Sequence, residues 1–187
     1  MAVASSPSGD VIATSCKATS AEHAVIRLYE TTTWQQILPP LAGHALTITR
    51  IVFSPDGQFI LSCSRDRTWR LFRKKEGQLG AFSPDPLVDS CPGSLIRPSA
   101  AYEPVAAEKP HARIIWDCAF GPDSSYFVTA ARDKQFKVWK KAAPGGDQWD
   151  AVATVKAAEA ATAVDIIRDE ENQRYVCSAL AHKRDWC

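Results

Sequence analysis

The stretches HALTITRIVFSPDGQFILSCSRDRTWRLF, at residues 44–72, and HARIIWDCAFGPDSSYFVTAARDKQFKVW, at residues 111–139, align with each other without a gap. Both begin with His, carry Pro-Asp after a short apolar run, contain Arg-Asp further on, and end on an aromatic residue. A third, partial copy precedes them between Ser6 and Tyr29. Self-similarity with a period of a few tens of residues predicts a repeat architecture. We therefore interpret the chain as copies of one structural unit.

Each unit has the pattern of an antiparallel meander. In the copy at 44–72, runs rich in apolar and β-branched residues at 50–53 and 59–64 flank a Ser-Pro-Asp-Gly segment. Pro at its second position and Gly at its fourth favour a tight turn at 54–57. After a second short connection, residues 68–72 alternate between polar and apolar side chains, as in a strand with two different faces. The sequence thus predicts three consecutive strands.

A fourth strand is expected at the outer edge of each unit, and the candidates are 36–41, 102–107 and 149–155. The first unit lacks a recognisable inner strand, and the fourth stops after two strands. The excess length between the second and third units falls in a Pro-rich loop, which we interpret as exposed or as a partner-binding insertion. The predicted units of this single domain are 1–43 with its inner strand missing, 44–110 with the loop 77–100, 111–160, and a truncated 161–187.

Four-stranded units with Gly43-His44 before a first strand, and with an aromatic residue ending the third, resemble the WD-repeat β-propeller family. The resemblance implies an all-β fold, with about three to four blades of four-stranded antiparallel sheet. A closed propeller has about 4–8 complete blades, so we expect an incomplete ring. The chain is then a fragment of a longer propeller protein, a truncated product, or a polypeptide that depends on a partner.

The same resemblance implies a hydrogen-bonded chain of His, Ser or Thr, Asp and Trp that locks each blade. The third unit offers all four members, His111, Thr129, Asp133 and Trp139. The second unit offers three, His44, Ser62 and Asp66, but ends on Phe72, which has no N–H to donate. Buried polar groups need partners, and no nucleophile recurs beside these His and Asp residues. We interpret both clusters as structural networks, with a catalytic dyad as the alternative.

Positive charge recurs at equivalent places in the second and third units. The candidate basic binding patch consists of Arg65, Arg67, Arg70, Arg73, Arg132, Lys134 and Lys137. Such a patch can bind phosphate backbones or an acidic partner through charge. The whole chain has a net charge of only +1, and alternating strands expose polar residues in any case. An ordinary solvated face therefore remains the other interpretation.

Composition argues against several classes of function. Hydrophobic residues make up 45% of the chain, and no apolar run approaches the roughly 20 residues that span a membrane. The six cysteines form no CxxC pair, and Cys177, His182 and Cys187 are too loosely spaced for a convincing metal site. No Gly-rich phosphate loop, carboxylate pair or activated nucleophile is recognisable. We expect no enzyme, no cofactor, no metal and no small-molecule substrate, and a location in the cytoplasm or also the nucleus.

A narrower resemblance rests on longer stretches. The segments ALTITRIVFSPDGQFILSCSRDRTWRLFRK and CKATSAEHAVIRLYETTTW, together with the copy at 111–139, are similar to the WD-repeat subunits of Elongator complexes. This resemblance implies a non-catalytic scaffold that holds the catalytic and largest subunits together and so supports modification of the wobble uridine of tRNA. It leaves room for weak contact with tRNA. The alternative is a WD-repeat adaptor of a ubiquitin ligase or a chromatin-modifying complex.

Overall fold

The computed structural model describes residues 1–75, 101–142, 148–169 and 174–181, with side chains placed up to residue 166 in the last part of the chain. The predicted loop 77–100 therefore lies outside the described residues, as do His182, Cys187 and the side chain of Cys177. In the described residues every regular element is a β-strand, and no helix is long and apolar enough to cross a membrane.

Fourteen strands form three four-stranded antiparallel sheets and one two-stranded sheet. The first sheet contains β1 (Ala2–Ser5), β2 (Val11–Ser15), β3 (Ile26–Glu30) and β4 (Gln36–Leu41). The second contains β5 (Ile48–Phe53), β6 (Phe59–Ser64), β7 (Trp69–Lys74) and β8 (Tyr102–Glu108). The third contains β9 (Ile115–Phe120), β10 (Tyr126–Ala131), β11 (Gln135–Lys141) and β12 (Trp149–Lys156). The fourth contains β13 (Ala161–Asp169) and β14 (Arg174–Ala181).

Strands follow one another in chain order within every sheet, so each unit is a meander. The predicted all-β, partial-propeller fold is confirmed. The three candidate outer strands are β4, β8 and β12, each paired with the strand before it. Tight turns and alternating patterns thus located most strands to within one or two residues.

The expectation that the first unit lacks its inner strand is wrong. Residues Ala2–Ser5 form β1, which pairs with β2 from Ala2 opposite Ser15 to Ser5 opposite Ile12. The segment is short and consists of small residues apart from Val3, so it carries no apolar pattern strong enough to be recognised. Backbone pairing with β2 holds it in place, because a ladder needs no large side chains.

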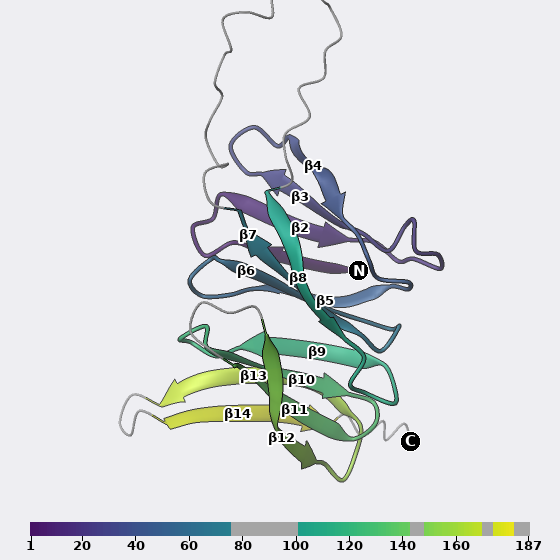
Figure 1. Cartoon of the computed structure of the whole chain (residues 1–187), viewed down its shortest axis with the longest axis vertical. Helices are drawn as coiled ribbons and strands as arrows, with labels where there is room; N and C mark the ends of the chain where they lie inside the picture. Colours follow the sequence, from purple (N-terminus) through teal and green to yellow (C-terminus); the bar gives the residue numbers. More distant parts are fainter. Residues whose placement is uncertain (76–100, 143–147, 170–173, 182–187) are drawn as a thin grey trace, which may run out of the picture.

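The sheets stack on one another, with the first sheet (β1 to β4) at the top of Figure 1, the second below it, and the third and fourth overlapping in the lower part of the view. The inner strands β1, β5, β9 and β13 are neighbours in that order. This is the arrangement of adjacent propeller blades, and in the described residues the stack does not close into a ring.

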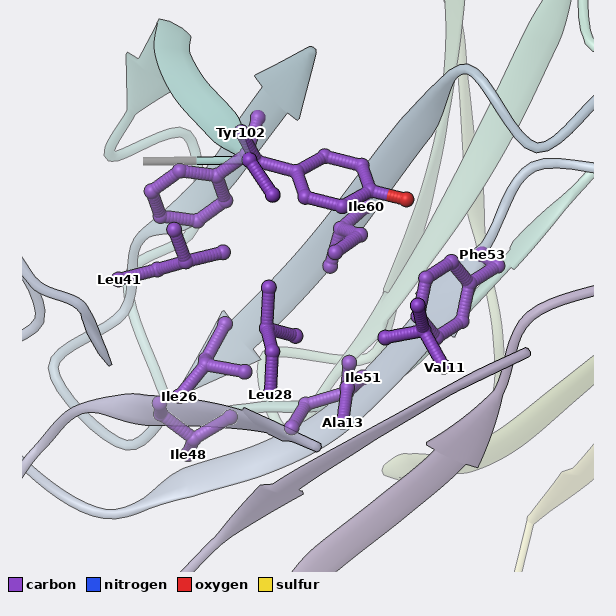
Figure 2. Packing of buried hydrophobic residues seen from close by; sticks show 12 residues of the cluster. Val11, Ala13, Ile26, Leu28, Leu41, Ile48, Ile51, Phe53, Ile60 and Tyr102 are labelled. Carbon is purple, nitrogen blue, oxygen red and sulfur yellow. The ribbon is translucent and has the colours of Figure 1, made fainter. Parts of the chain in front are cut away.

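A hydrophobic layer fills each interface between sheets, because side chains alternate between the two faces of every strand. Figure 2 shows the first layer, in which Leu28 of the first sheet lies beside Ile60 of the second. The second layer joins the second and third sheets through aromatic residues, including Trp69, Phe127 and Trp139. All six residues of β6 are buried, since this strand contributes to both layers. The second and third sheets therefore form the centre of the molecule.

Candidate functional site

The polar chain predicted for the third sheet lies at the face that packs against the second sheet. His111, just before β9, places Nδ1 3.0 Å from Asp133 Oδ2 and Nε2 2.9 Å from Thr129 Oγ1. Trp139 on β11 donates its indole N–H to the same Thr129 hydroxyl oxygen at 3.1 Å. All four predicted residues are therefore linked, from the start of β9 to the middle of β11.

The donor and acceptor roles within this hydrogen-bond network follow from the protonation state of His111. Burial lowers the pKa of His111 and outweighs the opposing effect of Asp133, so the imidazole is neutral near pH 7. A neutral ring that donates from Nδ1 to Asp133 must accept at Nε2. The Thr129 hydroxyl can then donate to His111 while it accepts from Trp139. Every member has a partner of the correct type, which is the requirement for a stable buried network.

The second sheet has the same arrangement with one member exchanged. His44 Nδ1 lies 3.0 Å from Asp66 Oδ2, and its Nε2 lies 2.9 Å from Ser62 Oγ. Phe72 stands where Trp139 stands in the third sheet and can donate nothing, so the network is shorter at that end. At the other end Thr68 extends it, because the Thr68 hydroxyl lies 3.1 Å from His44 Nδ1 and donates to Asp66 at 2.6 Å.

Thr68 was missed in the sequence analysis. Its signal is the spacing Asp-x-Thr, in which an Asp carboxylate accepts from the backbone N–H two residues later. Thr68 N donates to Asp66 Oδ1 at 2.8 Å in this way, and Gln135 N donates to Asp133 at 3.2 Å in the third sheet. The two hairpins share this turn, but only Thr68 adds a hydroxyl to the network.

Electrostatics in the second network favour an ionised Asp66. Burial alone would raise the pKa of Asp66, but hydrogen bonds from His44, Thr68 and the amide of Ala45 outweigh it and hold the pKa well below its usual range. The carboxylate thus accepts four hydrogen bonds, from the His44 imidazole, the Thr68 hydroxyl and the backbone amides of Ala45 and Thr68. A carboxylate satisfied in this manner has no remaining role as a general base.

Neither network is open to a substrate. The hydroxyl-bearing residues Ser62 and Thr129 are both 0% exposed, and His44 and His111 are buried. A nucleophile has to reach its substrate, so this geometry disfavours the catalytic dyad. In the described residues no group of three or more His, Cys, Asp or Glu side chains could hold a metal ion.

The seven candidate basic residues do not form one patch, and the structure divides them into three groups. Four lie exposed on the turns between the second and third strands of their sheets: Arg65, Arg67, Arg132 and Lys134. The Arg67 guanidinium reaches the carbonyl of Ala112 in the third unit at 3.5 Å, and Lys134 Nζ reaches that of Ala158 at 2.8 Å. These two turns are the exposed cationic surface that remains, and we call them the basic hairpins.

The other three residues have different surroundings. Arg70 and Lys137 lie in mid-strand at equivalent, half-buried positions opposite Ser62 and Thr129. The Arg70 guanidinium packs so closely against Gly43 that a Cβ there would lie 2.5 Å from Nη1. Arg73, towards the far end of β7, pairs with Glu103 at 2.8 Å. A contiguous patch was expected because the residues are close in sequence, but strand length separates the turn from the strand end.

Comparisons with known proteins agree with this geometry. The family model described as "WD domain, G-beta repeat" matches residues 35–73 and 102–140. Elongator complex protein 2 of Saccharomyces cerevisiae is 36% identical over 163 residues, which are 86% of this chain and 18% of the relative. The Rattus norvegicus protein of that name is 43% identical over 129 residues, 69% of this chain and 14% of the relative.

Elongator complex protein 2 of Schizosaccharomyces pombe is 40% identical over 166 residues, which are 88% of this chain and 19% of the relative. The chain thus spans less than a fifth of the length of these curated relatives. The residues matched by the family model include both polar networks.

Proposed function

Since the chain belongs to the WD-repeat family, and within that family is related to Elongator complex protein 2, we propose that it is a non-catalytic scaffold of an Elongator complex. The observation that carries the proposal is the identity of 36–43% to proteins of that name over 69–88% of the chain. In this role it holds the largest and the catalytic subunits together, and so supports modification of the wobble uridine of tRNA. The proposed location is the cytoplasm, and the nucleus as well.

The closed polar networks support a binding role. Their hydrogen-bonding groups are used within the sheets, so they rigidify the stack and leave turns and outer strands for contacts with other proteins. A stack of this kind displays many turns at its two rims, which suits simultaneous contact with several partners. The partners then bind to the exposed turns and outer strands. The buried networks contribute only by holding these surfaces in place.

Reconstitution tests the proposal. The full 187-residue chain is mixed with purified largest and catalytic Elongator subunits, and complexes are separated by size and analysed by light scattering. We expect a complex that contains the chain, with no turnover of tRNA by the chain alone. Purified ubiquitin-ligase adaptors and histone-modifying subunits serve as parallel arms. Binding to one of those and to neither Elongator subunit would favour the alternative adaptor role instead.

The basic hairpins support a second, weaker function, contact with tRNA. Four exposed cationic residues recur at equivalent turns of adjacent sheets, while Asp66 and Asp133 between them are already satisfied by hydrogen bonds. Phosphate contacts made through charge alone weaken as salt rises. We expect salt-sensitive binding of tRNA that decreases when Arg65, Arg67 and Arg132 are replaced by Ala.

The matched control for that experiment is Arg73→Ala, which removes a cation at the far end of β7 that is paired with Glu103. This variant should bind tRNA as the unchanged chain does. Equal affinity for the triple variant and the unchanged chain at all salt concentrations would exclude the RNA contact and leave the scaffold role standing.

A further inference from the structure

The inner strands of the second, third and fourth sheets carry the same irregularity. Each has one extra residue that interrupts its pairing with the next strand, at Thr49, Trp116 and Thr162. A bulge bends the strand and redirects the neighbouring side chains. In the second and third sheets a charged residue follows it, Arg50 on β5 and Asp117 on β9. The repeat thus places opposite charges side by side along the inner rim of the stack.

Asp117 uses this position to contact three sheets at once. Its Oδ1 lies 3.2 Å from Arg50 Nε of the second sheet and accepts from its own neighbour, the Cys118 amide, at 2.9 Å. Its Oδ2 accepts from the Val164 amide on β13 of the fourth sheet at 3.0 Å. The side chain of Asp117 is only 14% exposed, whereas that of Arg50 is 50% exposed.

The energetics of this carboxylate make the three contacts dependent on one another. Burial raises the pKa of Asp117, and the Val164 amide and Arg50 counteract that effect. A largely buried charge is costly unless it is paired and hydrogen-bonded. Removal of Arg50 therefore makes the ionised form of Asp117 less stable, and it weakens the charge-assisted hydrogen bond that this carboxylate accepts from the Val164 amide.

The described side chains between the third and fourth sheets form a hydrophobic layer with five buried members, Val128, Ala130, Phe136, Ala161 and Val164. The bond from the Val164 amide to Asp117 lies at this layer and adds a directional, charge-assisted contact to the apolar packing.

We propose that Asp117 is a positioning residue of the inner rim, through which Arg50 of the second sheet controls how firmly the fourth sheet is docked on the third. The link runs from Arg50 through the carboxylate to the backbone of β13. A partner that engages Arg50, which is half exposed on the inner rim, would loosen β13 and β14 without touching them. The inference concerns coupling between sheets and does not depend on the identity of the partner.

Native-state hydrogen exchange of the full 187-residue chain tests the link. The decisive variant is Arg50→Ala, because it leaves Asp117 and the fourth sheet intact. We expect amides of β13 and β14 to exchange about tenfold faster than in the unchanged chain, in line with the weakening of one charged hydrogen bond, while amides of β6 and β10 stay protected. Arg50→Lys, which keeps the charge, should restore part of the protection.

Asp117→Asn and Asp165→Asn form a matched pair of controls. Asp117→Asn removes the charge at the junction and should loosen the fourth sheet as Arg50→Ala does, and combining the two should add little. Asp165→Asn removes an exposed carboxylate on β13 whose Oδ1 accepts from the Ile166 amide and whose charge raises the pKa of Asp117. Its removal favours the ionised form of Asp117, so this variant should not speed exchange. The proposal is overturned if Arg50→Ala leaves β13 and β14 as protected as before, or if Asp165→Asn loosens them equally.

Discussion

At the scale of single residues, two buried tryptophans differ by one hydrogen bond. The indole N–H of Trp139 donates to Thr129 at 3.1 Å, whereas that of Trp69 is buried without a hydrogen-bond partner in the described part of the chain. The two rings touch, with centroids 5.1 Å apart, so they share one environment. The network of the third sheet thus selects Trp over Phe for a polar reason, and Trp69 is retained through packing.

Replacing each of these residues by Phe isolates that polar contribution. Both substitutions remove the same atoms from the same layer, so the cavity costs are comparable. Trp139→Phe also leaves Thr129 without a donor, whereas Trp69→Phe removes an unpartnered N–H. We expect the free energy of unfolding, measured by urea denaturation, to fall by about 1 kcal/mol more for Trp139→Phe than for Trp69→Phe. Equal losses would show that the indole N–H of Trp139 contributes nothing to stability.

Asp66 makes the free energy of unfolding depend on pH in the acid range. Its pKa is lowered in the folded chain, while the unfolded value is about 3.9. The contribution is therefore fully present above the unfolded pKa and is lost as the pH falls below it towards the folded pKa. Asp66→Asn abolishes this contribution, which is on the order of 2 kcal/mol. Between about pH 5 and pH 2 the variant should lose correspondingly less stability than the unchanged chain.

Chemical denaturation at a series of pH values measures that difference directly. Asp150→Asn serves as the control, because Asp150 is exposed and accepts only from the Gln148 side chain among the described residues. It should leave the acid dependence as it is. A curve for Asp66→Asn that runs parallel to the curve of the unchanged chain would contradict the role given to the network.

At the scale of elements, the turn between the first two strands recurs in three sheets with one change. Gly9 and Gly57 occupy the left-handed region with φ of 75° and 70°, and Ser124 takes the same place in the third sheet with φ of 59°. Left-handed conformation costs a non-glycine residue roughly 1–2 kcal/mol. Ser124 offsets part of this cost, because its hydroxyl oxygen accepts from the Asp56 amide of the neighbouring turn at 3.2 Å.

Two substitutions at this position separate strain from bonding. Ser124→Ala keeps the left-handed strain and loses the bond between the sheets, whereas Ser124→Gly loses the bond and relieves the strain. We expect Ser124→Gly to be close to neutral and Ser124→Ala to be the less stable by about 1 kcal/mol. Thermal unfolding of the two variants gives the answer, and a less stable glycine variant would refute the explanation.

The same elements show what sequence could and could not predict. Turn residues and alternating runs located the strands β2 to β14, because those signals are local. β1 was missed since Ala2–Ser5, with Val3 as the one larger residue, carries no pattern, although pairing with β2 stabilises it. The His and Asp of each network came from the family resemblance. The link between Arg50 and Asp117 was not predicted, because these residues are 67 positions apart and meet only when the sheets stack.

At the scale of the whole molecule, position in the stack decides how well each sheet is protected. In the described residues the second and third sheets have neighbours on both faces, and the first and fourth have a neighbour on one. Accordingly β6 is buried throughout, whereas Val3 on β1 is 67% exposed. The free energy of local opening should rise with the apolar area that a sheet buries.

Native-state hydrogen exchange on the isolated chain should reveal this order. We expect the amides of β6 and β10 to exchange only through global unfolding, those of β2 and β3 to open more easily, and those of β13 and β14 to be the least protected. The reason is that β10 contributes to the apolar layers on both of its faces, whereas in the described residues the two-stranded sheet of β13 and β14 has a neighbouring sheet on one face. If the outer sheets act as contact surfaces of a scaffold, addition of the largest or catalytic Elongator subunit should slow exchange there first and leave β6 unchanged. Uniform protection of all four sheets in the isolated chain would contradict this prediction. It would mean that the stack unfolds as one unit, and that the first and fourth sheets are as stable as the middle sheets without a neighbour on their outer faces.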